Sequence, residues 1–141
     1  MDNSLLSCAV IAWLTAQIIK VIMDAVLSKR LKIERIVGSG GMPSSHSALV
    51  AALATASALD YGINSFQFSV TAVLAAIVMY DASGVRRATG EQAKILNKMI
   101  ENFEKTSCSP FSEKRLKELV GHTPLQVFIG AALGVFIGLI Y

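Results

Sequence analysis

Four long stretches of the sequence carry few charges, and they constrain the fold more than any other feature. A helix needs about 20 mostly apolar residues to cross a hydrocarbon core roughly 30 Å thick. The chain is 53% hydrophobic and only 16% charged, whereas about 25% of the residues of soluble domains are charged. The candidate spans are Leu5–Leu27, His46–Ile63, Phe66–Ala82 and Pro124–Tyr141.

These stretches predict an all-α fold, an integral membrane helical bundle with about four transmembrane helices. The chain has 141 residues, which is the length of one domain, so we expect a single membrane-embedded domain over residues 1–141. The first span has neither the basic n-region nor the A-x-A-like cleavage site of a signal peptide, and we expect it to be retained.

The basic residues predict the orientation, because lysine and arginine are retained on the cytoplasmic side. They gather after the first span, at Lys29, Arg30, Lys32 and Arg35, and after the third, where eight lie between Arg86 and Lys117. The turn over 61–65 has none. We expect the protein to reside in the bacterial cytoplasmic membrane, with both links facing the cytoplasm. The net charge of +3 then reflects orientation and anionic-lipid contact, with no nucleic-acid partner.

The segment over 84–121 is the one sizeable part expected outside the membrane. Its stretch "EQAKILNKMIENFEK" places Ile95, Met99 and Phe103 at helical spacing, opposite lysines such as Lys94 and Lys98. This pattern predicts an amphipathic helix on the membrane surface or against the bundle. The stretch "EKRLKELV" predicts a second short helix over 113–120.

Two of the predicted spans carry a distinctive face. Gln17, Lys20 and Asp24 share one face of the first span. Because a charge in the bilayer centre costs about 2.5–3.5 kcal/mol, that face points into the bundle, unless Lys20 and Asp24 neutralise each other near the interface. The last span has small residues at spacing four, which let helices approach closely within the bundle or in a homodimer; these are Gly130, Gly134 and Gly138.

The chain has two histidines, and each stands at the start of a predicted span beside a proline and hydroxyl residues. His46 follows "GGMPSS", and His122 opens "HTP". Helix N-termini present unpaired amides and the positive end of the helix dipole, which favour a bound anion. An imidazole can attack phosphorus or protonate a leaving alcohol. The pattern therefore indicates phosphoryl transfer, with lysine and arginine holding the phosphate; the candidates are Lys20, Arg35, Arg86 and Arg87.

Four motifs carry a resemblance that extends over nearly the whole chain: "AWLTAQIIK", "GGMPSSHSA", "MYDASGVRRATGEQAKILN" and "GHTPLQV". Together they resemble the divergent branch of the phosphatidic acid phosphatase type 2 family, which is related to acid phosphatases and vanadium-dependent haloperoxidases. The resemblance implies that His122 is the nucleophile and forms a phosphohistidine, and that His46 protonates the leaving group. It also implies that Ser44 and Ser45 bind phosphate.

The sequence departs from the wider superfamily pattern at four places. Glycine is expected where Ser45 stands, and the arginine expected six places before the nucleophile falls on Leu116. No lysine precedes an arginine-proline pair, so Lys20 is the candidate for that role. The carboxylate expected four places after His122 is Gln126. A glutamine can orient an imidazole, but it cannot stabilise an imidazolium with a charge, which weakens or abolishes catalysis.

Two residues near the histidines have alternative roles. Gln126 either orients His122 or closes a capping box with Thr123 at the start of the last helix, and the two roles are compatible. Asp81 either orients a group of the site or pairs with Arg86 or Arg87 at a helix end.

Three functions fit the sequence. The first is a membrane phosphatase-like enzyme that acts on a lipid-linked phosphomonoester or pyrophosphate, with no cofactor and no metal, since two histidines without a carboxylate or cysteine cluster make a poor zinc site. The second is a non-catalytic membrane protein that binds an anionic headgroup or a partner. The third, a small transporter subunit, lacks the expected inverted repeat.

Overall fold

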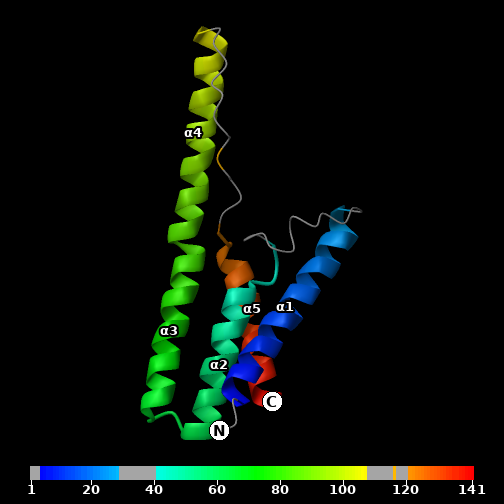
Figure 1. Cartoon of the computed structure of the whole chain (residues 1–141), viewed down its shortest axis with the longest axis vertical. Coiled ribbons are helices and arrows are strands. Elements are labelled where there is room, and N and C mark those ends of the chain that lie inside the picture. The colour runs from blue at the N-terminus through cyan, green and yellow to red at the C-terminus, as the bar shows by residue number, and fades with distance from the viewer. Residues whose placement is uncertain (1–3, 29–40, 108–115, 117–120) are drawn as a thin grey trace.

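The computed structural model describes residues 4–28, 41–107, 116 and 121–141. These residues form five α-helices and no strand: α1 (Ser4–Ser28), α2 (Ser45–Tyr61), α3 (Phe66–Ser83), α4 (Val85–Ser107) and α5 (Pro124–Ile140). The prediction of an all-α bundle is confirmed. Figure 1 shows both chain ends at one end of the bundle, whereas α2 and α5 begin, and α1 and α3 end, toward the other. Both predicted links therefore leave the bundle at the same end.

Local sequence sets where several helices begin. Ser44 caps α2 and accepts a hydrogen bond from the backbone N–H of Ser47, and Ser65 caps α3 in the same way with Phe68. These side chains satisfy backbone donors that the helix itself leaves unpaired. The turn from α2 to α3 passes through Gly62, which has a φ of 83°, a conformation that glycine adopts without steric cost.

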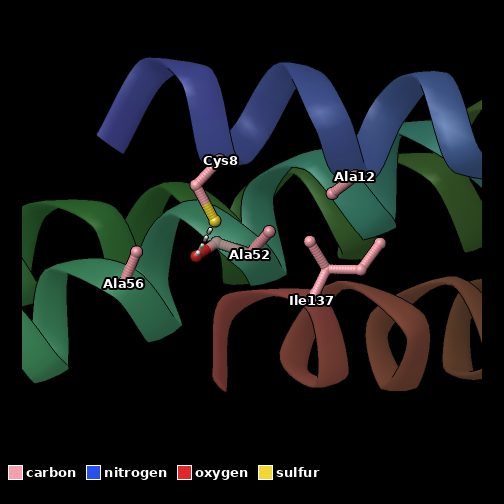
Figure 2. Close-up of a cluster of buried hydrophobic side chains, with 5 residues drawn as sticks. All are labelled: Cys8, Ala12, Ala52, Ala56 and Ile137. Atoms are coloured by element: carbon pink, nitrogen blue, oxygen red, sulfur yellow. Dashed lines mark hydrogen bonds between the residues drawn. The ribbon is translucent and has the colours of Figure 1, made fainter. Parts of the chain in front are cut away.

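The helix α2 lies at the centre and packs against α1, α3 and α5. Small side chains make this possible, because a helix with three neighbours has no room for a bulky side chain at each contact. Figure 2 shows one such contact, where Cys8 and Ala12 of α1 meet Ala52 and Ala56 of α2 and Ile137 of α5. The Cys8 thiol points to the Ala52 carbonyl oxygen at 4.0 Å.

The glycine face of α5 lies directly on α2 of the same chain. A Cβ atom on Gly130 would collide with the Ser44 carbonyl oxygen, and one on Gly134 would collide with the Ala48 carbonyl oxygen. All three glycines of this face, including Gly138, are buried. The face thus serves packing within the bundle, and a second chain would reach it only if α2 were displaced.

The outer surfaces of α1, α3 and α5 are apolar, as in a membrane protein. Among the described residues, two helical stretches are long and apolar enough to cross a bilayer, Ser4–Val26 and Phe66–Phe103, and α5 is a shorter apolar helix. On α3, large side chains face outward, with Phe66 80% and Ile77 60% exposed. Because water disfavours so much apolar surface, these side chains are suited to lipid.

The amphipathic helix exists, but its predicted position is wrong. In Figure 1, α4 continues in line with α3 beyond the ends of α1, α2 and α5, instead of lying across or against the bundle. The reason is local: Gly84 separates the two helices by a single residue, and its N–H bonds to the Tyr80 carbonyl oxygen as in a continuing helix.

The predicted helix over 113–120 is wrong at Leu116, which is the one residue of that stretch that the structure describes. Leu116 is not helical. Its N–H donates to the Asn97 side-chain oxygen at 3.0 Å, and its carbonyl accepts from the Asn97 side-chain nitrogen at 2.9 Å. The side chain of Asn97 on α4 thus pairs with this backbone as a neighbouring strand would.

Gly134→Ala is expected to destabilise the protein by about 1–3 kcal/mol, because the added methyl group overpacks the contact with Ala48. Alanine is a better helix former than glycine by about 1 kcal/mol, so a net loss can come only from packing. The thermal unfolding midpoint in detergent measures the effect. Ala132→Val, on an exposed position of the same helix, is the control, and an equal midpoint for both variants would contradict the packing.

Candidate functional site

His46 and His122 line one pocket at the end of the bundle from which both links leave. The pocket occupies about 270 Å³, including space open to solvent, and its other lining residues are Val78, Asp81, Ala82 and Arg86. His46 lies in the first turn of α2, and His122 lies two residues before α5. The structure therefore brings together the two imidazoles that the sequence singled out, with an arginine beside them.

Backbone contacts fix His122 against the junction of α3 and α4. Its N–H donates to the Ala82 carbonyl oxygen at 2.9 Å. The preceding residue, Gly121, has a φ of 94° and packs on the peptide between Arg86 and Arg87, where a Cβ would lie 2.5 Å from the Arg87 nitrogen. Only glycine fits so close a contact with a left-handed backbone. The side chain of His122 is consequently buried at the pocket wall, with a 5% exposed fraction.

Gln126 performs both of the roles that the sequence allowed. Its side-chain oxygen accepts from the Thr123 N–H at 3.1 Å and completes the capping box of α5. The same oxygen lies 3.2 Å from Nδ1 of His122. Because the Thr123 N–H is a donor, the atom between the two groups is the oxygen, and Nδ1 of His122 must then carry the proton. The remaining ring nitrogen, Nε2, keeps its lone pair.

Burial lowers the pKa of the His122 imidazole below its ordinary value of 6.5. The hydrogen bond to Gln126 opposes this change in pKa, and the positive charges of His46, Lys20 and Arg86 add to it. A lowered pKa keeps the imidazole neutral at pH 7, and a neutral imidazole is the form that can act as a nucleophile.

The two serines before His46 are buried in the protein. Ser44 is fully buried, and its hydroxyl oxygen accepts from the Ser47 hydroxyl at 2.9 Å as well as from the Ser47 N–H. Its N–H donates to the Gln126 carbonyl oxygen at 3.1 Å. Ser45 is buried too, and neither serine lines the pocket. Ser44 thus caps α2 and joins the two histidine segments, and phosphate binding by Ser44 and Ser45 stays a prediction.

The predicted phosphate-binding cations lie in different places. Arg86 lines the pocket, whereas the Arg87 side chain is exposed and does not. Lys20 is buried, and its aliphatic carbons lie beneath Gly41, whose Cβ would come 3.0 Å from the Lys20 Cδ atom. Lys20 does not line the pocket, but its positive charge contributes to the lowered pKa of His122. Arg35 falls outside the described residues.

Sequence reasoning missed the pocket wall that α3 supplies. Val78 and Ala82 are four residues apart and lie on the inner face of α3 with Asp81. Helical spacing around Asp81 would have found them. Gly121 directly before His122 was also a signal, because a glycine beside a functional residue often marks a close backbone approach. Among the described residues, no three His, Cys, Asp or Glu side chains are grouped as a metal site requires.

Comparison with known proteins identifies the family. The sequence pattern of the divergent PAP2 family, the phosphatidic acid phosphatase type 2 relatives, matches residues 1–137. The chain belongs to this family. It is also 40% identical over 149 aligned residues to the uncharacterized membrane protein YuiD of Bacillus subtilis (strain 168), an alignment that covers 99% of this chain and 94% of that protein. No solved structure matches the chain. A helical membrane protein of the divergent PAP2 family is thus shown, and the match includes every residue that lines the pocket.

One departure of this chain from the wider superfamily pattern falls on a residue whose backbone contacts α4. Leu116 stands where an arginine is expected, and its backbone is held by Asn97 on α4. Among the described residues, the guanidinium that lines the pocket is that of Arg86, at the start of α4.

Gln126→Glu is expected to raise the pKa of His122, because a carboxylate beside Nδ1 favours the imidazolium. Glutamate also fits the capping box, so the fold is retained. NMR titration of the two histidines in detergent measures the pKa, and His46→Gln assigns the signals. In the parent protein His122 should titrate below 6.5, its ordinary value. An unchanged pKa in Gln126→Glu would contradict the contact between residue 126 and the imidazole.

The same change should alter the pH dependence of stability. The unfolded chain protonates His122 near the ordinary pKa, above the pKa of the folded state. The unfolded state therefore binds more protons as pH falls from 7 through that value, and the folded protein loses stability. Gln126→Glu reduces this loss, which thermal unfolding at a series of pH values measures.

Proposed function

We propose that the protein hydrolyses a phosphomonoester or pyrophosphate attached to a lipid, through a phosphohistidine intermediate. The observation that carries this proposal is the single pocket lined by His46, His122 and Arg86. The two imidazoles come from opposite halves of the sequence, and an arginine beside them can hold phosphate oxygens. The apolar outer surface of the helices supports a lipid substrate, which would reach the pocket from the bilayer.

In this proposal each imidazole has the role that the family resemblance implies. Nε2 of His122, with Nδ1 held by Gln126, attacks phosphorus and forms a P–N bond while the bond from phosphorus to the leaving oxygen breaks. His46 gives its proton to that oxygen. Water then attacks the phosphohistidine, His46 takes the proton of the water, and the P–N bond breaks to release phosphate. Arg86 and the charge of Lys20 stabilise the negative oxygens in both steps.

The distribution of lysine and arginine supports a cytoplasmic location for the pocket. The helix ends that the two basic links connect lie at the pocket end of the bundle, and basic links are retained in the cytoplasm. In this proposal the protein resides in the bacterial cytoplasmic membrane, and its substrate headgroup lies in the inner leaflet.

A second candidate function is binding of an anionic headgroup without turnover, and Gln126 favours it. Its side-chain oxygen is shared between the Thr123 N–H and His122. A neutral oxygen with two donors stabilises an imidazolium less than a carboxylate does. Binding would use Arg86 and the neutral form of His122, and neither would need to change its protonation state.

His122→Ala should abolish hydrolysis, and His46→Ala should lower kcat by about 10²–10⁴, the range for losing a general acid. The purified protein in detergent is assayed for phosphate release from a panel of lipid phosphates and lipid pyrophosphates. A substrate labelled with ³²P traps the phosphohistidine as acid-labile protein-bound label. The label is expected in the parent protein and absent from His122→Ala.

Lys94→Ala is the control, because Lys94 lies on the exposed side of α4 and pairs with Glu91 at 3.0 Å. Equal turnover in this variant and loss in both histidine variants support the enzyme. Headgroup binding with no phosphate release across the panel would instead establish the second function.

A further inference from the structure

Asp81 is the only acid among the described residues that line the pocket. A carboxylate repels a phosphate group, so its place beside the two imidazoles calls for an explanation. Asp81 lies in the last turn of α3, one helical turn after Val78 and next to Ala82 on the pocket wall.

The Asp81 carboxylate engages one particular atom of Arg86. Its Oδ2 atom accepts from Nε of Arg86 at 2.7 Å, so the ion pair bridges the junction at Gly84 between α3 and α4. A guanidinium has five N–H donors, of which Nε supplies one. Contact through Nε leaves the edge formed by the two Nη groups for another ligand. That edge can bind two oxygens of a phosphate side by side.

Stability does not explain this ion pair. The side chains of Arg86 and Asp81 are 48% and 39% exposed, and exposed ion pairs contribute little to the free energy of unfolding. The binding of an anion by Arg86 gains more from this ion pair than the stability of the fold does. A free arginine loses rotamer entropy when it binds an anion, whereas an arginine already held at Nε has lost much of that freedom beforehand.

We propose that Asp81 is a positioning residue, which holds Nε of Arg86 so that the two Nη groups face the pocket and bind a phosphate group. The inference takes the nature of the ligand from the proposed function, but it does not require turnover. It also accounts for the difference between the neighbouring arginines. Arg86 pairs with Asp81 at the pocket wall, whereas Arg87 is exposed and does not line the pocket.

The rival explanation is that Asp81 competes with phosphate for Arg86. Two substitutions separate the explanations. Asp81→Ala removes both the charge and the acceptor, and Asp81→Asn removes the charge but keeps an oxygen acceptor for Nε. If Asp81 positions Arg86, Asp81→Ala weakens phosphate binding about tenfold, the scale of one immobilised side chain, and Asp81→Asn restores it. If Asp81 competes, both substitutions strengthen binding.

Isothermal titration calorimetry of the full chain in detergent with inorganic phosphate is the test. In an Arg86→Lys background, where Nε of the guanidinium is absent, Asp81→Ala should cause no further weakening. Asp60→Ala is the matched control, because Asp60 is an exposed aspartate near the opposite end of α2 from His46. Circular dichroism and the thermal midpoint verify that each variant folds, and the recovery in Asp81→Asn is a result that a purely structural role would not produce.

The inference is overturned if Asp81→Ala binds phosphate as tightly as the parent protein or more tightly, or if the parent protein binds no phosphate. Failure of the proposed function is a separate result. Phosphate binding that depends on Asp81 and Arg86 as described, with no hydrolysis of any lipid phosphate, supports the inference and contradicts the enzyme.

Discussion

The close approach of the α2 and α5 backbones is the contact on which the rest of the structure depends. Glycine at 130 and 134 removes the side chains that would hold the helices apart, so that the carbonyl groups of Ser44 and Ala48 lie directly on α5. This approach lets the Ser44 N–H reach the Gln126 carbonyl oxygen. The two histidine segments are therefore joined through their backbones, and a bulkier residue at Gly130 would separate them.

Gln126 links this helix packing to the imidazole of His122. Its backbone carbonyl oxygen accepts a hydrogen bond from the Ser44 N–H, just before α2. Its side-chain oxygen accepts hydrogen bonds from the Thr123 N–H and from Nδ1 of His122. One residue thus starts a helix, joins two segments and selects the imidazole tautomer. A carboxylate at the same position would do all three and also stabilise a positive imidazole. The chain belongs to the divergent PAP2 family, and the glutamine at this position gives His122 a neutral hydrogen-bond partner instead of a charged one.

The junction of α3 and α4 was the part that the sequence predicted least well. The apolar periodicity of α4 was clear, and the helix exists, but periodicity says which face is apolar and not what that face contacts. The sequence also favoured Arg86 and Arg87 equally. Their difference depends on the turn of the helix after Gly84, which places Arg86 beside Asp81 and the pocket. Similarly, the hydroxyl of Ser44 is drawn to the N-terminus of its own helix, because unpaired backbone donors lie nearest to it.

By itself the sequence determined the properties that depend on residue type and spacing: the helical spans, the capping box that begins at Thr123, the glycine face of α5 and the two histidines at helix starts. The convergence of those histidines on one pocket was an expectation, drawn from their similar positions at helix starts and from the family resemblance. Only the tertiary structure decided it, together with the choice of Arg86 and the carboxylate beside it. The physical reason is that caps and periodicity act within a few residues of the chain, whereas a pocket is made by contacts between helices, and those contacts depend on how closely whole backbones pack.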